Sequence, residues 1–166
     1  MAFVGKSKRA QQQFETPEEM YLRGALPRTG DAVSSLWIHQ GDVLRAYAEK
    51  HQDTADIALE LPTGTGKTLP GLLIAEWVRR KAAGPVLYAA PTRQLARQVL
   101  ATANNEGVPA RLLVGSHLSW PVADQSDVEG GEAVAITTYS SIFNSSPKLP
   151  VPRLVVLDDA LVGENH

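Results

Sequence analysis

The sequence contains no cysteine among its 166 residues. Disulfide scaffolds, thiolate zinc sites and cysteine nucleophiles are therefore excluded. The four histidines are scattered without the spacing of metal ligands. No apolar run approaches the roughly 20 residues that a membrane helix needs, and the basic first residues lead into glutamines, unlike a signal peptide. These absences favour a soluble cytoplasmic protein.

Neither sign of charge dominates the chain, which has 16 basic and 18 acidic residues and a net charge of −2. This excludes a histone-like polycation but leaves room for a local basic stripe. Hydrophobic residues make up 43% of the chain and charged residues 20%, which predicts a folded core rather than global disorder. The length suits one domain of ordinary size.

The pattern of apolar residues changes near residue 36. Residues 1–35 are predicted to form a polar, partly disordered leader with one short helix near residues 17–23. Beyond them, short apolar runs alternate with helical spacing, and the segments 117–131 and 144–152 are expected to be loops. Helices are expected at 36–50, 69–81, 92–104 and 140–143, and strands at 57–61, 86–89, 111–114, 134–136 and 154–157. This alternation predicts an α/β fold, a parallel sheet with helices on both faces, over residues 36–166.

A glycine-rich turn joins the expected strand 57–61 to the helix that follows. It reads Pro-Thr-Gly-Thr-Gly-Lys-Thr over residues 62–68. Glycines let backbone N–H groups approach phosphate oxygens, and the helix that follows presents its positive end to an anion. Lys67 can reach the β- and γ-phosphates of a nucleotide, and the Thr68 hydroxyl can complete a Mg²⁺ shell. The alternative interpretation is an ordinary turn with a solvated lysine.

Two carboxylates follow the last expected strand, at Asp158 and Asp159. A buried strand that ends in an acid is typical of a Walker B segment. There the first carboxylate reaches the metal, and the next acid orients the attacking water. A solvated acidic turn is the alternative.

The segment 62–68 resembles motif I of superfamily 2 helicases, since Leu61 stands where other P-loop proteins have glycine. Residues 90–98, Ala-Pro-Thr-Arg-Gln-Leu-Ala-Arg-Gln, resemble motif Ia of the same superfamily. The resemblance implies a RecA-like lobe that binds ATP and Mg²⁺, with Lys67, Asp158 and Asp159 as catalytic residues and Thr68 and Asp158 at the metal. The nucleotide-binding residues implied are Gln40, Pro62, Thr63, Gly64, Thr65, Gly66, Lys67 and Thr68.

The same resemblance implies further roles outside motif I. Gln40 lies 27 residues before Lys67, where the family has a glutamine that reads the adenine edge. The strand ends and loops expected to face nucleic acid supply Pro91, Thr92, Arg93, Gly115, Thr137 and Thr138. At each of these positions an ordinary surface residue or helix cap is the alternative.

The chain departs from the family pattern at its acidic box, which reads Asp-Asp-Ala-Leu over residues 158–161. Asp159 replaces glutamate and Leu161 replaces a polar residue. The seven residues after Asp159 cannot hold the Ser-Ala-Thr motif and the second RecA-like lobe that follow in these motors. We therefore expect an incomplete first lobe of a helicase or translocase, which needs its second lobe and hydrolyses ATP poorly alone. The alternatives are a motor subunit of a restriction or repair complex and a non-hydrolysing nucleotide-binding module.

Overall fold

The centre of the protein is a parallel sheet. The computed structural model describes residues 12–54, 66–82, 84–144 and 146–158. Its four strands are β1 (Val86–Ala90), β2 (Ala110–Leu112), β3 (Val134–Thr138) and β4 (Leu154–Leu157). They lie in the order β2-β3-β1-β4, with Tyr88 of β1 opposite Ile136 of β3 and Val156 of β4.

The apolar runs of the sequence become the buried interior of this sheet. Every residue of β1 and β3 is buried, as expected of central parallel strands covered on both faces. β4 lies at one edge of the sheet of described strands, and most of its residues are only half-buried. The continuous apolar strands predicted at 86–89, 134–136 and 154–157 are confirmed.

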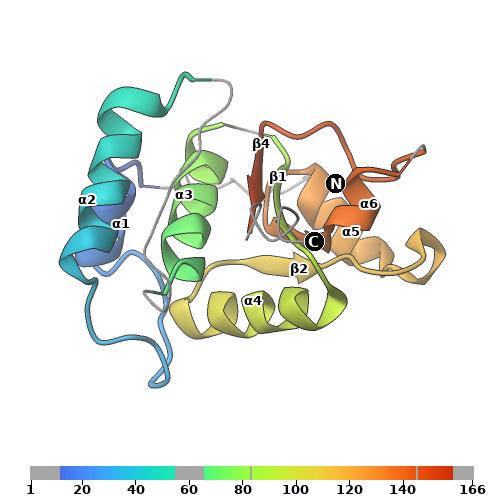
Figure 1. The fold of residues 1–166 in the computed structure, drawn as a ribbon, viewed down its shortest axis with the longest axis horizontal. Coiled ribbons are helices and arrows are strands. Elements are labelled where there is room, and N and C mark those ends of the chain that lie inside the picture. Colours follow the sequence, from blue (N-terminus) through green and yellow to red (C-terminus); the bar gives the residue numbers. More distant parts are fainter. Residues whose placement is uncertain (1–11, 55–65, 83, 145, 159–166) are drawn as a thin grey trace, which may run out of the picture.

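Helices cover both faces of the sheet (Figure 1). They are α1 (Pro17–Leu22), α2 (Ile38–Ala46), the π-helix η1 (Tyr47–His51), α3 (Thr68–Lys81), α4 (Arg93–Glu106), the 3₁₀ helix η2 (His117–Ser119), α5 (Val122–Glu129) and α6 (Tyr139–Ile142). Val86 and Tyr88 belong to the larger apolar cluster, which α1 to α4 share. Leu87 of the same strand belongs to a second cluster, with Trp120 and Val128. The predicted α/β class is therefore correct.

Local sequence signals set the bounds of α4. The Thr92 side chain caps its first turn by accepting a hydrogen bond from the Leu95 N–H at 3.1 Å. Gly107 ends the helix in the left-handed conformation, with φ at 75°. The helices predicted at 69–81 and 92–104 are thus confirmed, whereas the strand predicted at 57–61 lies outside the described residues.

The prediction of a loop at 117–131 is wrong, because this segment contains η2 and α5. Pro121 and Gly130, residue types that favour loops, flank this helix at its start and its end. Val128 is the one residue of α5 that is buried, so the segment lacks the apolar stripe that predicts a helix.

The segment predicted as a partly disordered leader contributes to the core over its described part. Phe14, Met20, Tyr21 and Leu26 are buried in the larger cluster. The indole N–H of Trp77 donates a hydrogen bond to the Phe14 carbonyl at 2.8 Å. The short helix predicted here is confirmed as α1, but six residues are too few to show a helical period. The domain boundary at residue 36 stays a prediction.

We expect Gly107→Ala to lower the free energy of unfolding by about 1–3 kcal/mol. A Cβ at Gly107 would lie 2.7 Å from backbone atoms of Pro27, and its φ of 75° disfavours any residue with a Cβ. Urea unfolding followed by circular dichroism measures the change. Gly30→Ala is the matched control, because an added Cβ there meets nothing within 4 Å. Equal stability of the two variants would contradict the close packing of Pro27 on α4.

Candidate nucleotide and nucleic-acid site

The residues predicted to act on ligands gather at one edge of the sheet. Because the strands are parallel, their carboxyl ends lie together. Pro91 follows β1, Gly115 lies just beyond β2, Thr138 ends β3 and Asp158 follows β4. Open α/β sheets bind ligands at this edge.

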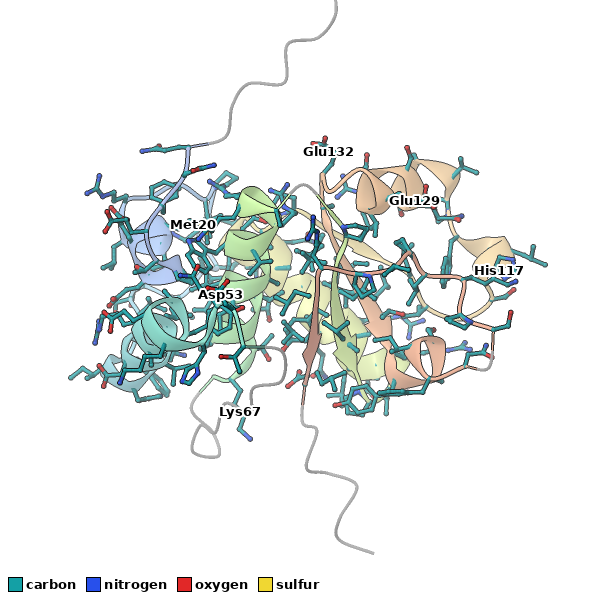
Figure 2. All side chains as sticks on the ribbon, turned by 90° about the horizontal axis from the view of Figure 1, so that it is seen from above. Met20, Asp53, Lys67, His117, Glu129 and Glu132 are labelled. Carbon is teal, nitrogen blue, oxygen red and sulfur yellow. The ribbon has the colours of Figure 1, made fainter. Side chains whose placement is uncertain are left out.

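A cavity of about 200 Å³ brings together three residues predicted for nucleotide binding, Lys67, Thr68 and Asp158. Thr68 is the first residue of α3, and Lys67 precedes it without capping the helix through its side chain. Figure 2 shows the Lys67 side chain extending away from the start of α3. The arrangement puts an ammonium group, a hydroxyl and a carboxylate beside the positive end of a helix, which suits a nucleotide phosphate and its metal.

One wall of this cavity comes from α4, and the sequence interpretation did not assign it to the nucleotide. The residues that line it are Leu95, Gln98, Val99 and Thr102. Their spacing places them on one helix face, so helical periodicity is the signal that could have grouped them. What periodicity alone does not show is that this face meets Lys67 and Asp158.

Two hydrogen bonds fix the backbone of Asp158 at the end of β4. Its N–H donates to the Ala89 carbonyl at 2.9 Å, and its own carbonyl accepts from the Tyr139 hydroxyl. Tyr139 follows directly after Thr138, so the end of β3 is tied to the residue predicted to hold the metal. The position of this residue therefore depends on the neighbouring strand β1 and on the segment that follows β3.

The donor set of the cavity suits magnesium. Among the described residues, no three His, Cys, Asp or Glu side chains gather in a protein-made metal cage. Magnesium is commonly held by one or two carboxylates together with phosphate oxygens and water. Thr68 and Asp158, which line the same cavity, match that coordination.

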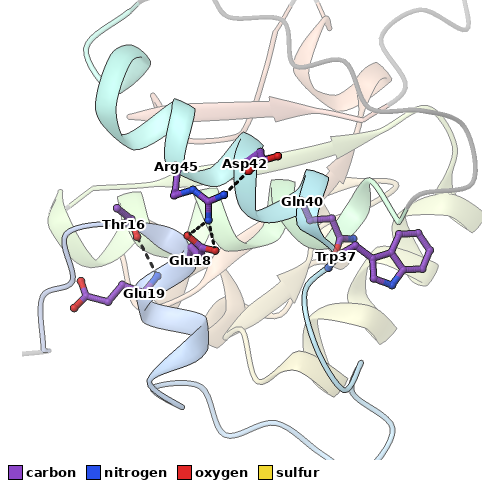
Figure 3. Close-up of polar contacts among 7 residues, drawn as sticks. All are labelled: Thr16, Glu18, Glu19, Trp37, Gln40, Asp42 and Arg45. Carbon is purple, nitrogen blue, oxygen red and sulfur yellow. Dashed lines mark hydrogen bonds and ion pairs between the residues drawn. The ribbon is translucent and has the colours of Figure 1, made fainter.

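Gln40 is buried, lies beside Trp37 at the start of α2 (Figure 3), and links this helix to Gly66 of the glycine-rich turn. Its side-chain oxygen accepts a hydrogen bond from the Trp37 N–H at 2.9 Å, and its NH₂ group donates to the Gly66 carbonyl at 3.0 Å. A carboxamide carries both a donor group and an acceptor, which is the pairing that the adenine edge requires. The adenine role of Gln40 stays a prediction.

Arg93 and Gly115, both predicted to face nucleic acid, lie next to each other. The guanidinium of Arg93 would be 3.6 Å from a Cβ at Gly115, whose φ of 73° is left-handed. Thr92 and Arg93 are exposed, and Pro91 is half-buried. The structure thus joins the ends of β1 and β2 into one surface with a cationic side chain.

The two threonines that end β3 are buried. Thr137 donates its hydroxyl hydrogen to the Leu113 carbonyl at 2.7 Å, so it ties β3 to the segment after β2. The Thr138 hydroxyl hydrogen-bonds the Ser140 and Ser141 hydroxyls of α6. Both side chains hold neighbouring segments in place, and the nucleic-acid contact assigned to them stays a prediction.

Five predicted site residues lie outside the described part of the chain. They are Pro62, Thr63, Gly64, Thr65 and Asp159. Their assignments remain predictions from motif I and from the acidic pair.

The chain matches the model of the DEAD/DEAH box helicase family over residues 39–161, more than half of its length. No curated protein and no solved structure matches it significantly. Among the described residues, no helix has the length and apolar character required to span a bilayer. The matched range contains the four described strands and the cavity of Lys67, Thr68 and Asp158, and its parallel sheet between helices is the RecA-like arrangement. The chain therefore belongs to the DEAD/DEAH box helicase family, whose members are helicase-type ATPases that act on nucleic acid.

Proposed function

We propose that this chain is the ATP- and nucleic-acid-binding lobe of a superfamily 2 helicase or translocase, which couples ATP hydrolysis to remodelling of nucleic acid. One observation carries the proposal: Lys67, Thr68 and Asp158 line a single cavity. That cavity opens at the same edge of the sheet as the surface of Arg93 and Gly115. A family match over these segments supports the same assignment.

Each residue of the cavity has a distinct role in this proposal. The Lys67 ammonium group binds the β- and γ-phosphates as a point charge. Thr68 and Asp158 hold Mg²⁺, which when bound offsets the negative charge of the phosphates. Asp159 orients the attacking water. Gln40 positions the glycine-rich turn through its hydrogen bond to the Gly66 carbonyl, and it reads the adenine edge.

Helix α4 provides the physical connection between the two ligands. The guanidinium of its first residue, Arg93, lies next to Gly115, and four of its later residues line the nucleotide cavity. A helix is a stiff element, so a shift at one end displaces the wall at the other. Nucleic acid held at Arg93 would in this way change the fit of the nucleotide.

The acidic box favours one alternative within the same site. Asp159 has a side chain one methylene shorter than the glutamate usual at this position, so its carboxylate has a shorter reach. A displacement of about 1 Å can cost about 100-fold in rate. A non-hydrolysing nucleotide-binding module would bind ATP through Lys67 and release it unchanged. The family resemblance implies that hydrolysis needs a second RecA-like lobe. An ATP hydrolysis assay in the presence of that lobe therefore distinguishes a hydrolysing motor from a non-hydrolysing module.

We expect Asp158→Asn to abolish the dependence of ATP binding on Mg²⁺. Asparagine keeps the shape of the side chain but removes the charge that binds the cation. Calorimetric titration with ATP, in Mg²⁺ and in a chelator, measures this dependence for the wild type and the variant. The variant is expected to bind equally in the two conditions, whereas the wild type binds more tightly in Mg²⁺.

Asp31→Asn is the matched control, because Asp31 is exposed in the segment before α2. This control is expected to keep the wild-type response to Mg²⁺. A normal response in Asp158→Asn would remove Asp158 from the metal site. If the wild type bound no ATP in either condition, the proposed function itself would be wrong.

A further inference from the structure

A second cavity, of about 260 Å³, lies on the flank of the sheet that carries η2 and α6. It shares no lining residue with the nucleotide cavity. Figure 2 shows His117, which lines the second cavity, well to one side of Lys67. Its lining includes Gly115, His117, Trp120, Ser141, Asn144 and Lys148, and of these six only Gly115 was assigned a role by the sequence.

The aromatic part of the cavity is held in a defined position. Trp120 is 8% exposed, and its indole N–H donates to the Val114 carbonyl at 3.0 Å. The His117 ring packs edge-on against Trp120, with the ring centroids 6.4 Å apart. His117 itself is only half-buried, so it offers an aromatic surface in the cavity next to Trp120.

The charge of the cavity favours an anion. Lys148 is exposed and lines it, and none of the described residues of its lining is a carboxylate. Ser141 and Asn144 add polar groups that can donate to oxygen. Gly115 lies at the wall of this cavity and also next to the Arg93 guanidinium. Gly115 is therefore shared by the surface of Arg93 and by the cavity that Lys148 lines.

We propose that this cavity holds one nucleotide of a single-stranded nucleic acid that continues from Arg93 past Gly115. Lys148 binds a phosphate of that nucleotide, and the base stacks on His117. The cavity is smaller than the about 300–1,000 Å³ typical of sites for drug-sized ligands, and it suits a single nucleotide unit. Single strands expose their bases for stacking on aromatic side chains, whereas duplexes do not. This inference rests on the proposed nucleic-acid binding and extends it to residues outside the helicase motifs.

The inference is tested by the binding of fluorescently labelled single-stranded RNA and DNA oligonucleotides to the whole chain. Fluorescence anisotropy is measured over a series of salt concentrations for the wild type, Lys148→Ala and His117→Ala. Lys50→Ala and His51→Ala serve as matched controls, since both residues belong to η1. Thermal unfolding verifies that each variant is folded.

Lys148→Ala is expected to weaken binding at least threefold at low salt. It is also expected to make the slope of log affinity against log salt shallower by about 0.7, the value for one phosphate contact on a single strand. His117→Ala is expected to weaken binding about fivefold or more with an unchanged slope, because stacking does not release counterions. Both control variants are expected to bind like the wild type.

The possible outcomes separate this inference from the proposed function. If the wild type binds an oligonucleotide and Lys148→Ala and His117→Ala bind as tightly as the controls, the cavity is not a nucleotide site, while nucleic-acid binding stands. If the wild type binds neither RNA nor DNA at low salt, the proposed nucleic-acid function is wrong together with this inference. Lys148 is exposed, so its replacement tests the phosphate contact even if His117→Ala unfolds the protein.

Discussion

Replacing Lys67 with alanine is expected to weaken ATP binding at least tenfold, which corresponds to about 1.4 kcal/mol. Lys67 lines the nucleotide cavity together with Thr68 and Asp158, and it is the cationic residue among those that line it. Alanine removes the charge that would meet the β- and γ-phosphates, while the start of α3 remains. Calorimetric titration of the wild type and the variant with Mg²⁺ and ATP measures the difference.

Lys50→Ala is a suitable control for this experiment, because Lys50 is exposed in η1 and takes no part in lining the cavity. The control is expected to bind ATP as the wild type does. Equal affinity of Lys67→Ala and the wild type would show that the turn at Gly66 does not hold phosphate. The nucleotide would then have to bind elsewhere.

The largest loss of stability is expected for Glu76→Ala, about 3–5 kcal/mol in the free energy of unfolding. Glu76 is fully buried and accepts hydrogen bonds from Arg79 at 2.8 and 2.7 Å. The Arg80 Nε also donates to Glu76, at 2.8 Å. Alanine would leave the guanidinium of Arg79, whose side chain is 2% exposed, without its carboxylate in a buried position. Urea unfolding followed by circular dichroism measures the loss.

Glu129→Ala, at the exposed end of α5, is the matched control and is expected to change stability by no more than about 0.5 kcal/mol. A second variant tests the cause. Replacing both Glu76 and Arg79 with leucine removes the ion pair as a unit, and it is expected to be less destabilising than Glu76→Ala alone. If Glu76→Ala loses less than about 1 kcal/mol, the buried pair is not a significant source of stability.

Local sequence signals were sufficient for most of the regular elements. α4 is specified by a capping threonine, an apolar stripe and a glycine stop, all read from neighbouring residues. The strands β1 and β3 appear as continuous apolar runs because both of their faces are buried. Elements whose burial is one-sided or slight carry a weaker signal, and α5 was missed for that reason.

The leader shows a different limit of sequence interpretation. Its buried residues, such as Phe14 and Met20, are too few and too irregular to form a period. They are buried because α3 offers an apolar surface to them, with Trp77 bonded to the Phe14 carbonyl. Burial of this kind depends on a partner surface that is distant in the sequence, so no local pattern encodes it.

The candidate site also has features that the sequence predicts and features that only the fold decides. The sequence by itself determined the chemistry, since the turn ending in Gly66, Lys67 and Thr68 and the acid at Asp158 are recognisable from residue type and spacing. Only the tertiary structure decided which groups meet. It places the middle of α4 beside Lys67 and Asp158, and it joins the Thr137 hydroxyl to the Leu113 carbonyl by a hydrogen bond. It also brings His117 and Lys148 to one cavity. Residue type fixes what a side chain can bind. The parallel order of the strands brings side chains from distant segments to one edge of the sheet, and that order arises from packing across the whole chain.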